Sequence, residues 1–421
     1  MSNKNRVPNI RFMGFKGEWA EKKFINCLAK IIDFRGKTPK KLGLSWSNNG
    51  KYRALSALNV KNGFIDKNID VHFGNYDLYK KWMGNTELEK GDILFTTEAP
   101  MGNIAIIKDD EKYILSQRTI AFRVDAKNIN GPFLLYKLNT VSTKNKLMSL
   151  STGGTAQGIS QKNLSYLFIS VSNDLNEQQK IGDFFSKLDK LLDLQQQKID
   201  KLELLKKALL QKLFPKYGAK IPELRFKEFK NEWEKEKLKG YIEKVSGNDG
   251  RMNLPTLTIS AAKGWMNQNE RFSNNIAGKE QKNYTLLKKG ELSYNHGNSK
   301  LFKYGVVYEL INYDEALVPK VYHSFRVNSK ASARFIEYLF RGKKVDRELR
   351  KLVTSGARMD GLLNINFNNF ENIQLYFPEK AEQQKIGNLL SKVDQLIELE
   401  NKKLQDFQQV KKCLLQNMFV E

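Results

Sequence analysis

The stretch NEQQKIGDFFSKLDKLLDL begins at Asn176, and a closely similar stretch, AEQQKIGNLLSKVDQLIEL, begins at Ala381. When the comparison is extended without a gap to residues 176–214 and 381–419, 18 of the 39 paired positions are identical. One protein therefore contains the same long segment twice, once near its middle and once at its end. This duplication decides the fold that the sequence predicts.

Each copy of the repeated segment is predicted to be one long helix. Apolar residues recur at helical spacing from Ile181 to Leu209 and from Ile386 to Leu414, and neither segment contains proline. Pro215 follows the first segment and stops it. A helix of about 36 residues is about 55 Å long, so two such helices with matching apolar stripes are expected to pair as an antiparallel coiled coil.

The apolar stripe is interrupted once in each copy, at Gln195 and at Glu400. In an antiparallel pair related by a pseudo-twofold axis, these two positions would lie near the axis. We therefore expect Gln195 and Glu400 to set the helix register, as single polar core residues can do. A solvent-exposed break in the stripe is the alternative.

The rest of the chain is also duplicated. The entry motif VPNIRFMGFKGEW from Val7 returns as IPELRFKEFKNEW from Ile221, and LEKGDILFT from Leu88 returns as LKKGELSYN from Leu287. This order predicts four segments: a first globular domain at 1–175, a helix at 176–214, a second globular domain at 215–380 and a helix at 381–421.

The globular segments mix strand-like and helix-like runs. Strands are expected at GDILFT, NIAII, YILSQRTIAFRV and YLFISV in the first segment, and at TLTIS, YGVVYEL, KVYHSFRV and NIQLYF in the second. Each segment also has one helical stretch, PFLLYKLNTVSTKNKLMSL or RFIEYLFRGKKVDRELRKLV. Because strands and helices do not alternate regularly, the predicted class is α+β.

The charge indicates a polyanionic partner. The 421 residues carry 71 Lys and Arg against 46 Asp and Glu, a net charge of +25. The two helical segments contribute only +2 and +1, so about +22 lies on the remainder. A basic excess on the globular segments favours nucleic acid, although a merely basic surface is the simpler alternative.

Motifs for catalysis, metals and membranes are missing from the sequence. It has no G-x-x-x-x-G-K-[ST] loop, no G-x-G-x-x-G spacing, and only two cysteines and three histidines, all scattered. We therefore expect no catalytic residue, no metal and no cofactor on this chain. With no apolar run of membrane length and no signal peptide, we expect a cytoplasmic protein without a membrane partner.

Several polar loops are suited to contacting DNA, because Lys and Arg bind phosphates while Asn, Gln, Arg and His can read base edges. Five segments stand out: DFRGKTPKKLGLSW (33–46), FTTEAPMGN (95–103) with its counterpart YNHGNSKLFK (294–303), and the glycine-rich STGGTAQGIS (151–160) with its counterpart TSGARMDGLLN (354–364). The predicted contact residues are Arg35, Lys37, Lys40, Lys41, Thr97, Thr155, Gln157, Asn295, His296, Asn298, Ser299, Lys300 and Arg358. For each of them, ordinary surface is the alternative.

The whole chain resembles the specificity subunit of type I restriction–modification systems. The phrases that carry the resemblance are GKTP at 36–39, GDILF at 91–95, the loop TGGTAQGIS and the two EQQKIG helix starts. The second half departs from the pattern, because it lacks the GKTP phrase and its TSGARMDG loop is looser.

The resemblance implies a non-catalytic subunit that binds double-stranded DNA. Each globular segment would be a target recognition domain for one half of a split, asymmetric target. The helices would space the two domains and dock two methyltransferase subunits carrying S-adenosylmethionine. Restriction subunits, which act as motor and nuclease and use ATP and Mg²⁺, would join that complex.

Two other classes of function stay open from the sequence. One is a stand-alone DNA-binding protein with two modules and no enzymatic partners. The other is a nuclease or methyltransferase whose motifs are unrecognised.

Overall fold

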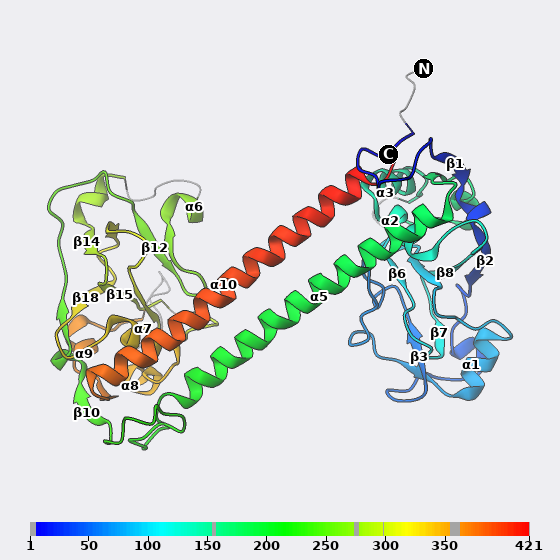
Figure 1. The fold of residues 1–421 in the computed structure, drawn as a ribbon. Coiled ribbons are helices and arrows are strands. Elements are labelled where there is room, and N and C mark those ends of the chain that lie inside the picture. The colour runs from blue at the N-terminus through cyan, green and yellow to red at the C-terminus, as the bar shows by residue number, and fades with distance from the viewer. Residues whose placement is uncertain (1–5, 154–156, 273–277, 298, 354–362, 421) are drawn as a thin grey trace. The chain divides into compact units, whose positions relative to one another are not determined.

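The structure is a computed structural model that describes residues 6–153, 157–272, 278–297, 299–353 and 363–420. The chain divides into two compact units, Met1–Gln196 together with Lys403–Glu421, and Gln197–Lys402. Each unit contains one mixed helix-and-sheet domain (Figure 1) and about half of each long helix. The first unit is therefore discontinuous in sequence, since it combines residues 1–196 with residues 403–421, whereas the second unit is one continuous segment.

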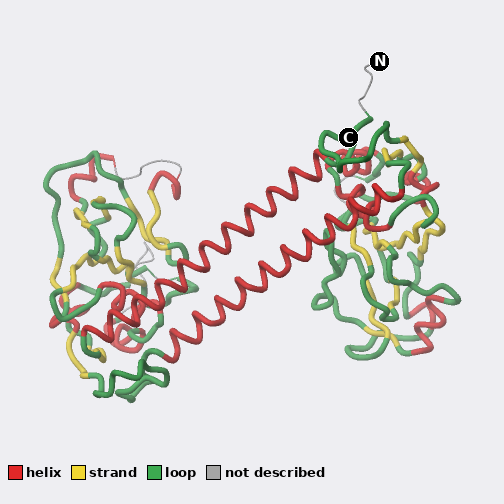
Figure 2. The backbone as a smooth tube through the Cα atoms, in the orientation of Figure 1, coloured by secondary structure: helices red, strands yellow, loops and turns green. Residues whose placement is uncertain are grey.

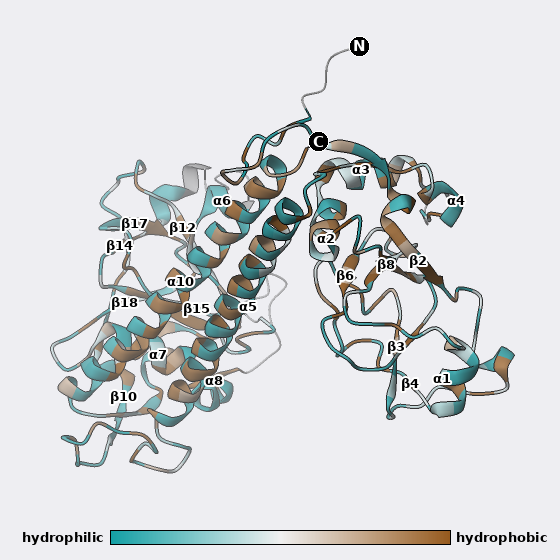
Figure 3. Ribbon diagram, turned by 45° about the vertical axis from the view of Figure 1, so that its right-hand side comes forward, coloured by the Kyte–Doolittle hydropathy of each residue, from teal (hydrophilic) through white to brown (hydrophobic). Residues whose placement is uncertain are grey.

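The two long helices are α5 (Leu175–Lys212) and α10 (Lys380–Asn417), each of 38 residues. Figure 2 shows both as unbroken helices. Hydrophobic and hydrophilic residues alternate along their surfaces (Figure 3), as the repeated apolar stripe predicts. Among the described residues, no helix is both long and apolar enough to cross a membrane.

The first unit is built on a four-stranded antiparallel sheet with the order β2-β8-β5-β6. Its strands are β2 (Leu28–Asp33), β8 (Thr119–Val124), β5 (Ile93–Thr96) and β6 (Ile104–Ile106). Ile93 and Phe95 pack into the core that contacts the long helices, whereas Leu94 packs into a second core on the opposite face. Because both faces are covered, the strand is a continuous apolar run rather than an alternating one.

Smaller elements complete the first unit. A two-stranded sheet pairs β1 (Ala20–Lys23) with β9 (Phe168–Val171), and a three-stranded sheet has the order β4 (Phe73–Gly74), β3 (Tyr52–Leu55), β7 (Tyr113–Leu115). The short helices are α1 (Tyr76–Met83), α2 (Gly131–Asn139), α3 (Val141–Ser149) and α4 (Gln161–Leu164), with 3₁₀ turns η1 (Phe24–Cys27) and η2 (Lys40–Leu42).

The second unit repeats this plan. Its main sheet has the order β11-β18-β15-β16, with strands β11 (Ile242–Lys244), β18 (His323–Val327), β15 (Leu292–Asn295) and β16 (Val306–Glu309). Three two-stranded sheets pair β10 (Glu234–Lys237) with β19 (Gln374–Phe377), β12 (Leu257–Ser260) with β13 (Gly264–Asn267), and β14 (Thr285–Lys288) with β17 (Glu315–Val318). The helices are α6 (Gln268–Phe272), α7 (Ala333–Arg341), α8 (Asp346–Leu352) and α9 (Phe367–Glu371), with η3 (Leu238–Gly240) and η4 (Gly278–Asn283).

Three predicted elements are divided in the structure. The helical stretch RFIEYLFRGKKVDRELRKLV (334–353) forms α7 and α8, with residues 342–345 between them. The run YILSQRTIAFRV, expected as one strand, forms β7 and β8 in different sheets with a turn at residues 116–118 between them. Arg118 in this turn has φ 63°, a conformation that ends a strand. The helical stretch expected at 132–150 divides into α2 and α3 at Thr140, whose side chain accepts a hydrogen bond from the Thr143 amide and caps α3.

The end of each long helix fills the core of a domain. Phe419, after α10, packs against Trp19 and Phe133 of the first unit with ring centroids 6.1 and 5.3 Å away. Phe214, after α5, packs in the same way against Trp233 and Phe335 of the second unit, at 6.2 and 5.5 Å. Each domain core is thus completed by an aromatic residue from a helix end.

The glycine of the repeated EQQKIG phrase allows the start of α5 to approach its domain closely. A Cβ atom on Gly182 would lie 2.9 Å from the Phe133 amide nitrogen and 2.7 Å from Asn130 Oδ1. We predict that Gly182→Ala lowers the free energy of unfolding by about 1–3 kcal/mol, because this overpacking outweighs the helix propensity that alanine adds.

Chemical denaturation of the purified protein measures this change, and Gly240→Ala is the matched control because a Cβ there meets nothing within 4 Å. Equal stability of the Gly182 and Gly240 variants would contradict the close packing of α5.

Candidate nucleic-acid interface

In the first unit, loops at one end of the main sheet surround a cavity of about 330 Å³. The C-terminal ends of β2 and β5 and the N-terminal end of β8 meet there, since β8 is antiparallel to both. The cavity is lined by Thr38, Pro39, Trp46, Ser56, Ala57, Leu58, Asp70, His72, Trp82, Ala99, Ser116, Gln117 and Arg118. The cavity is therefore lined by the GKTP segment and the 95–103 loop, which the sequence predicted as contact loops, and by the turn at 116–118, which the sequence did not predict.

The cations predicted in the 33–46 segment differ in their surroundings. Lys37 is turned inward: its Nζ donates to the Trp82 carbonyl at 2.5 Å and lies 4.6 Å from the centre of the Phe34 ring. Burial lowers the pKa of this lysine. Arg35 is exposed but pairs with Asp33, while Lys40 and Lys41 are exposed on η2.

Thr97 is buried rather than displayed, and its backbone connects two loops. Its amide donates to the Arg118 carbonyl at 2.9 Å, and its carbonyl accepts from the Ile159 amide at 3.0 Å. Thr97 therefore ties the 116–118 turn to the end of the glycine-rich loop. In that loop, Gln157 is exposed, and Thr155 lies outside the described residues.

His296 occupies the equivalent place in the second unit, one residue after β15, and is also buried. Its ring bridges two backbone carbonyls, with Nε2 2.8 Å from Val321 O and Nδ1 2.7 Å from Leu363 O. Its own carbonyl accepts from the Leu363 amide at 2.9 Å. His296 thus holds the turn before β18 against the segment that follows the second glycine-rich stretch.

A neighbouring histidine packs on His296. The rings of His296 and His323 are stacked with centroids 5.0 Å apart, and burial lowers the pKa of His323 to about 4. His323 is therefore neutral near pH 7, and its Nε2 lies 2.8 Å from the Ile365 carbonyl oxygen. Both histidines serve as internal supports for exposed loops.

The remaining residues predicted in the 294–303 loop include both anchors and exposed groups. As predicted, this loop connects two paired strands, β15 and β16. Asn295 donates to the Ile259 carbonyl and accepts from the Gly297 amide, and Ser299 closes a turn with Phe302. Lys300 is exposed, whereas Asn298 and Arg358 lie outside the described residues.

A basic hollow of about 520 Å³ lies at the corresponding loops of the second unit. Three exposed lysines contribute to its lining, Lys244, Lys282 and Lys320, and no Asp or Glu of the described chain does. Lys320 belongs to residues 319–321, between β17 and β18, as residues 116–118 lie between β7 and β8. This hollow can accept a polyanion without like-charge repulsion.

Sequence reasoning missed the residues of these two turns, above all Gln117, Arg118 and Lys320. The available signal was the polar triplet Ser-Gln-Arg inside an otherwise apolar run, and the proline before Lys320.

The repeated helix start is used for internal docking. Glu177 is fully buried and accepts two hydrogen bonds from Arg11 of the entry motif, at 2.6 and 2.9 Å. Glu382 and Arg225 form the same pair in the second unit, at 2.8 Å. Such bidentate pairs fix geometry, so the doubled phrase first of all attaches each helix to its own domain.

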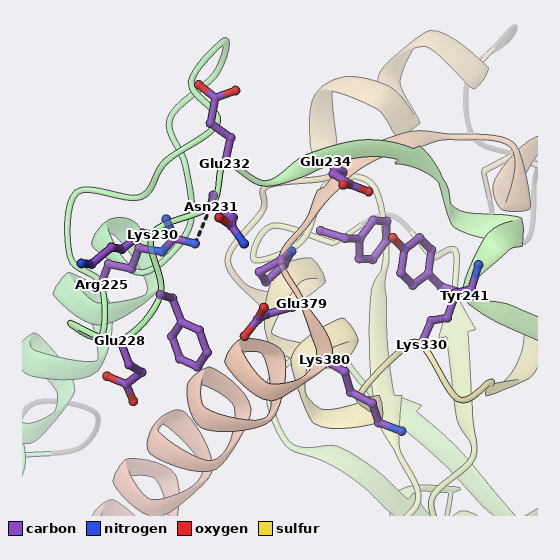
Figure 4. Close-up of a pocket in the computed structure, with 13 residues that line it drawn as sticks. Arg225, Glu228, Lys230, Asn231, Glu232, Glu234, Tyr241, Lys330, Glu379 and Lys380 are labelled. Atoms are coloured by element: carbon purple, nitrogen blue, oxygen red, sulfur yellow. Dashed lines mark hydrogen bonds between the residues drawn. The ribbon is translucent and has the colours of Figure 1, made fainter.

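Another cavity, of about 690 Å³, lies beside the second of these pairs (Figure 4). Its lining carries as many acidic as basic side chains: Arg225, Lys230, Lys330 and Lys380 against Glu228, Glu232, Glu234 and Glu379. Arg225 also donates to the Asn231 carbonyl at 2.6 Å, the bond drawn in Figure 4. The balance of charge makes this cavity a poor site for DNA.

Within each unit, the two long helices are linked by an aspartate of the repeat. In the first unit Asp189 of α5 accepts from Lys411 of α10 and from Tyr136 OH. In the second, Asp394 of α10 accepts from Lys206 of α5 at 2.5 Å and from Tyr338 OH at 2.9 Å.

The second unit also contains the pair Lys198–Glu400, at 2.7 Å. From Lys198 to Lys206 the partner moves back from Glu400 to Asp394, so the helices run antiparallel there. Glu400 is buried, whereas Gln195 is half-buried and belongs to the first unit. Their joint role in the helix register stays a prediction.

Comparison with known proteins identifies a family. The family model of the type I restriction modification DNA specificity domain matches the chain twice, over residues 17–204 and 230–409. A curated relative, the putative type I restriction enzyme MjaX specificity subunit of Methanocaldococcus jannaschii, is 28% identical over 158 residues. That match spans 36% of this chain and 37% of the relative.

Solved structures share the fold over nearly the full length. The S subunit of a type I restriction-modification system from M. genitalium has a TM-score of 0.63 at 16% identity and covers 99% of both chains. A chain from a study of complex assembly and conformational transition of the type I R-M system has a TM-score of 0.52 at 14% identity, covering 95% of this chain and 97% of that one.

The burial of His296 predicts a different effect for two substitutions in the same loop. His296→Ala should lower the free energy of unfolding by about 2 kcal/mol, because it removes the contacts of a buried ring to two backbone carbonyls. Lys300→Ala should change stability by less than about 0.5 kcal/mol, because this side chain is exposed. Denaturant unfolding of the two variants measures the difference, and an unaffected His296→Ala protein would contradict the bridging role.

Proposed function

Because the chain belongs to the family of type I restriction–modification DNA specificity domains, we propose that it reads a two-part, asymmetric DNA target, one half-site per unit. As a member of that family it recognises DNA sequence and is not a catalytic subunit. The proposal adds that the two domains read different bases and that the long helices dock two methyltransferase subunits.

The observation that carries the proposal is a pair of equivalent loop clusters with different linings. Each cluster lies at the equivalent end of the main sheet of its own unit. Each is held by the residue that follows β5 or β15, which is Thr97 in the first unit and His296 in the second. Yet one cavity has Trp46, Gln117 and Arg118, while the other has three lysines. Two domains that read different half-sites need loop clusters at equivalent positions with different side chains, and these two clusters meet that requirement.

Exposed apolar residues on the helices support partner docking. Leu191 and Leu194 of α5 are 49% and 54% exposed, and their repeat equivalents in α10, Leu396 and Leu399, are 46% and 56% exposed. Exposed apolar residues grouped on a surface often mark protein contacts. Their repetition offers two equivalent faces, which suits two copies of the same partner.

The cofactors follow from the partners in this proposal. S-adenosylmethionine would be bound by the methyltransferase subunits, and ATP and Mg²⁺ by the restriction subunits. Within the described residues there is no group of three or more His, Cys, Asp or Glu that could hold a metal ion. The alternative proposal is a stand-alone DNA-binding protein with two modules and no enzymatic partners.

Mapping methylated bases across the genome of the host, with and without this gene, tests the proposal. We predict a two-part motif with an unspecified gap that is methylated only when the gene is present. A motif that survives deletion would contradict the assignment. A chain that binds DNA but changes no methylation and captures no methyltransferase would favour the stand-alone alternative.

Docking on the helices has its own test. We predict that Leu194→Glu combined with Leu399→Glu weakens co-purification of a methyltransferase subunit at least tenfold, because charge is placed in an apolar contact. Binding of the isolated chain to DNA should be unchanged. Full retention of the methyltransferase by the double variant would place the docking face elsewhere.

A further inference from the structure

The turn at residues 116–118 has an unusual backbone and exposed polar side chains. Gln117 and Arg118 are exposed at the cavity of the first unit. Of the four non-glycine residues with positive φ in the described part of the chain, three line this cavity: Asp70 (φ 48°), Ala99 (φ 47°) and Arg118 (φ 63°). Backbone strain of this kind costs free energy and is found mainly where function needs it.

The turn is held firmly at its base while its side chains can exchange partners. The Arg118 carbonyl accepts from the Thr97 amide at 2.9 Å, and the flanking residues Leu115 and Thr119 are buried. Within the described part of the chain, the Arg118 guanidinium pairs with the exposed carboxylate of Glu98 at 3.3 Å, and the two side chains are 56% and 46% exposed. Such a surface pair is weak, so the guanidinium can exchange this partner for a base.

The second unit has an equivalent turn with different side chains. The run Phe325-Arg326-Val327 repeats Phe122-Arg123-Val124, and aligning the two sets Val321 opposite Arg118 and Lys320 opposite Gln117. Both Lys320 and Val321 are exposed. The Val321 carbonyl lies 2.8 Å from His296 Nε2, as the Arg118 carbonyl is bonded to Thr97.

The chemistry of these side chains suits base edges in the major groove. Arginine and lysine pair with O6 and N7 of guanine, glutamine pairs with N6 and N7 of adenine, and an apolar side chain contacts the thymine methyl group. A rigid turn with exposed side chains can present these groups without a large ordering cost on binding.

We propose that residues 116–118 and 319–321 are the specificity-determining turns of the two units. Gln117 and Arg118 contact bases of one half-site, and Lys320 and Val321 contact bases of the other. This inference rests on the proposed function and assigns its base-reading residues.

Selection from a library of random-sequence duplexes with the purified full-length chain tests the assignment. We expect Arg118→Ala to make one base position degenerate in one half-site and to lower affinity for the selected wild-type sequence by about 5- to 150-fold. Lys320→Ala should do the same in the other half-site. Arg118→Lys should retain part of the preference, because it keeps the charge but loses the two-bond geometry.

Arg326→Ala is the matched control. Arg326 is an exposed arginine on β18 with a similar pair, to Glu243 at 2.9 Å with side chains 60% and 54% exposed, but it is not among the residues that line the hollow. It should change affinity uniformly for all sequences or not at all. Thermal unfolding verifies that each variant is folded, and Gln117→Ala provides a second test of the first turn.

The outcomes separate the inference from the function on which it rests. If the wild-type chain selects a two-part motif and the Arg118, Gln117 and Lys320 variants select the same motif at full affinity, the turns do not read bases. If Arg118→Ala alters both half-sites, the assignment of one turn to one half-site is wrong. If the wild-type chain enriches no sequence, the proposed function itself fails, and the inference fails with it.

Discussion

Phe214 and Phe419 stand at the ends of the two long helices, and each is packed between a tryptophan of an entry motif and a phenylalanine of a short helix. Neither domain core is complete without this ring, since Trp19 and Trp233 are both almost fully buried against it. The first unit therefore needs the last residues of the chain, and the second needs the end of α5. Burial of an aromatic ring of this size is worth several kcal/mol relative to exposure, enough to couple helix position to domain folding.

The repeated phrase follows from this constraint. A helix that ends in one core must start in a defined orientation, and Glu177 with Arg11, or Glu382 with Arg225, provides that start. Asp189 and Asp394 then link the start of one helix to the end of the other and to a tyrosine of the adjacent domain. A buried carboxylate that accepts two hydrogen bonds from one arginine, as Glu177 and Glu382 do, tolerates few geometries, so the orientation of the helices is specified in each unit separately.

Much of this architecture could be predicted from the sequence because it is periodic or repeated. The apolar stripe predicted both long helices, and the paired phrases predicted two similar α+β domains with hairpin loops at 95–103 and 294–303. The burial of Thr97 and His296 could not be predicted, because their partners, Arg118, Val321 and Leu363, are distant in sequence. The turn at 116–118 was not predicted because its polar triplet is short and apolar residues flank it on both sides, and because an arginine does not itself indicate a left-handed backbone. The role of the EQQKIG phrase within each unit rests on contacts of the same long-range kind, because Glu177 and Glu382 pair with Arg11 and Arg225 of the entry motifs.

The central proposal is that one chain holds two independent readers that leave a stretch of DNA between them unread. Base-interference mapping on a complex of the full-length chain with its target duplex tests this claim most directly, because it scores every base for its contribution to binding. The account predicts two short clusters of essential bases separated by a gap of several tolerant positions, with different sequences in the two clusters. A single continuous cluster, or two clusters of identical palindromic sequence, would contradict it.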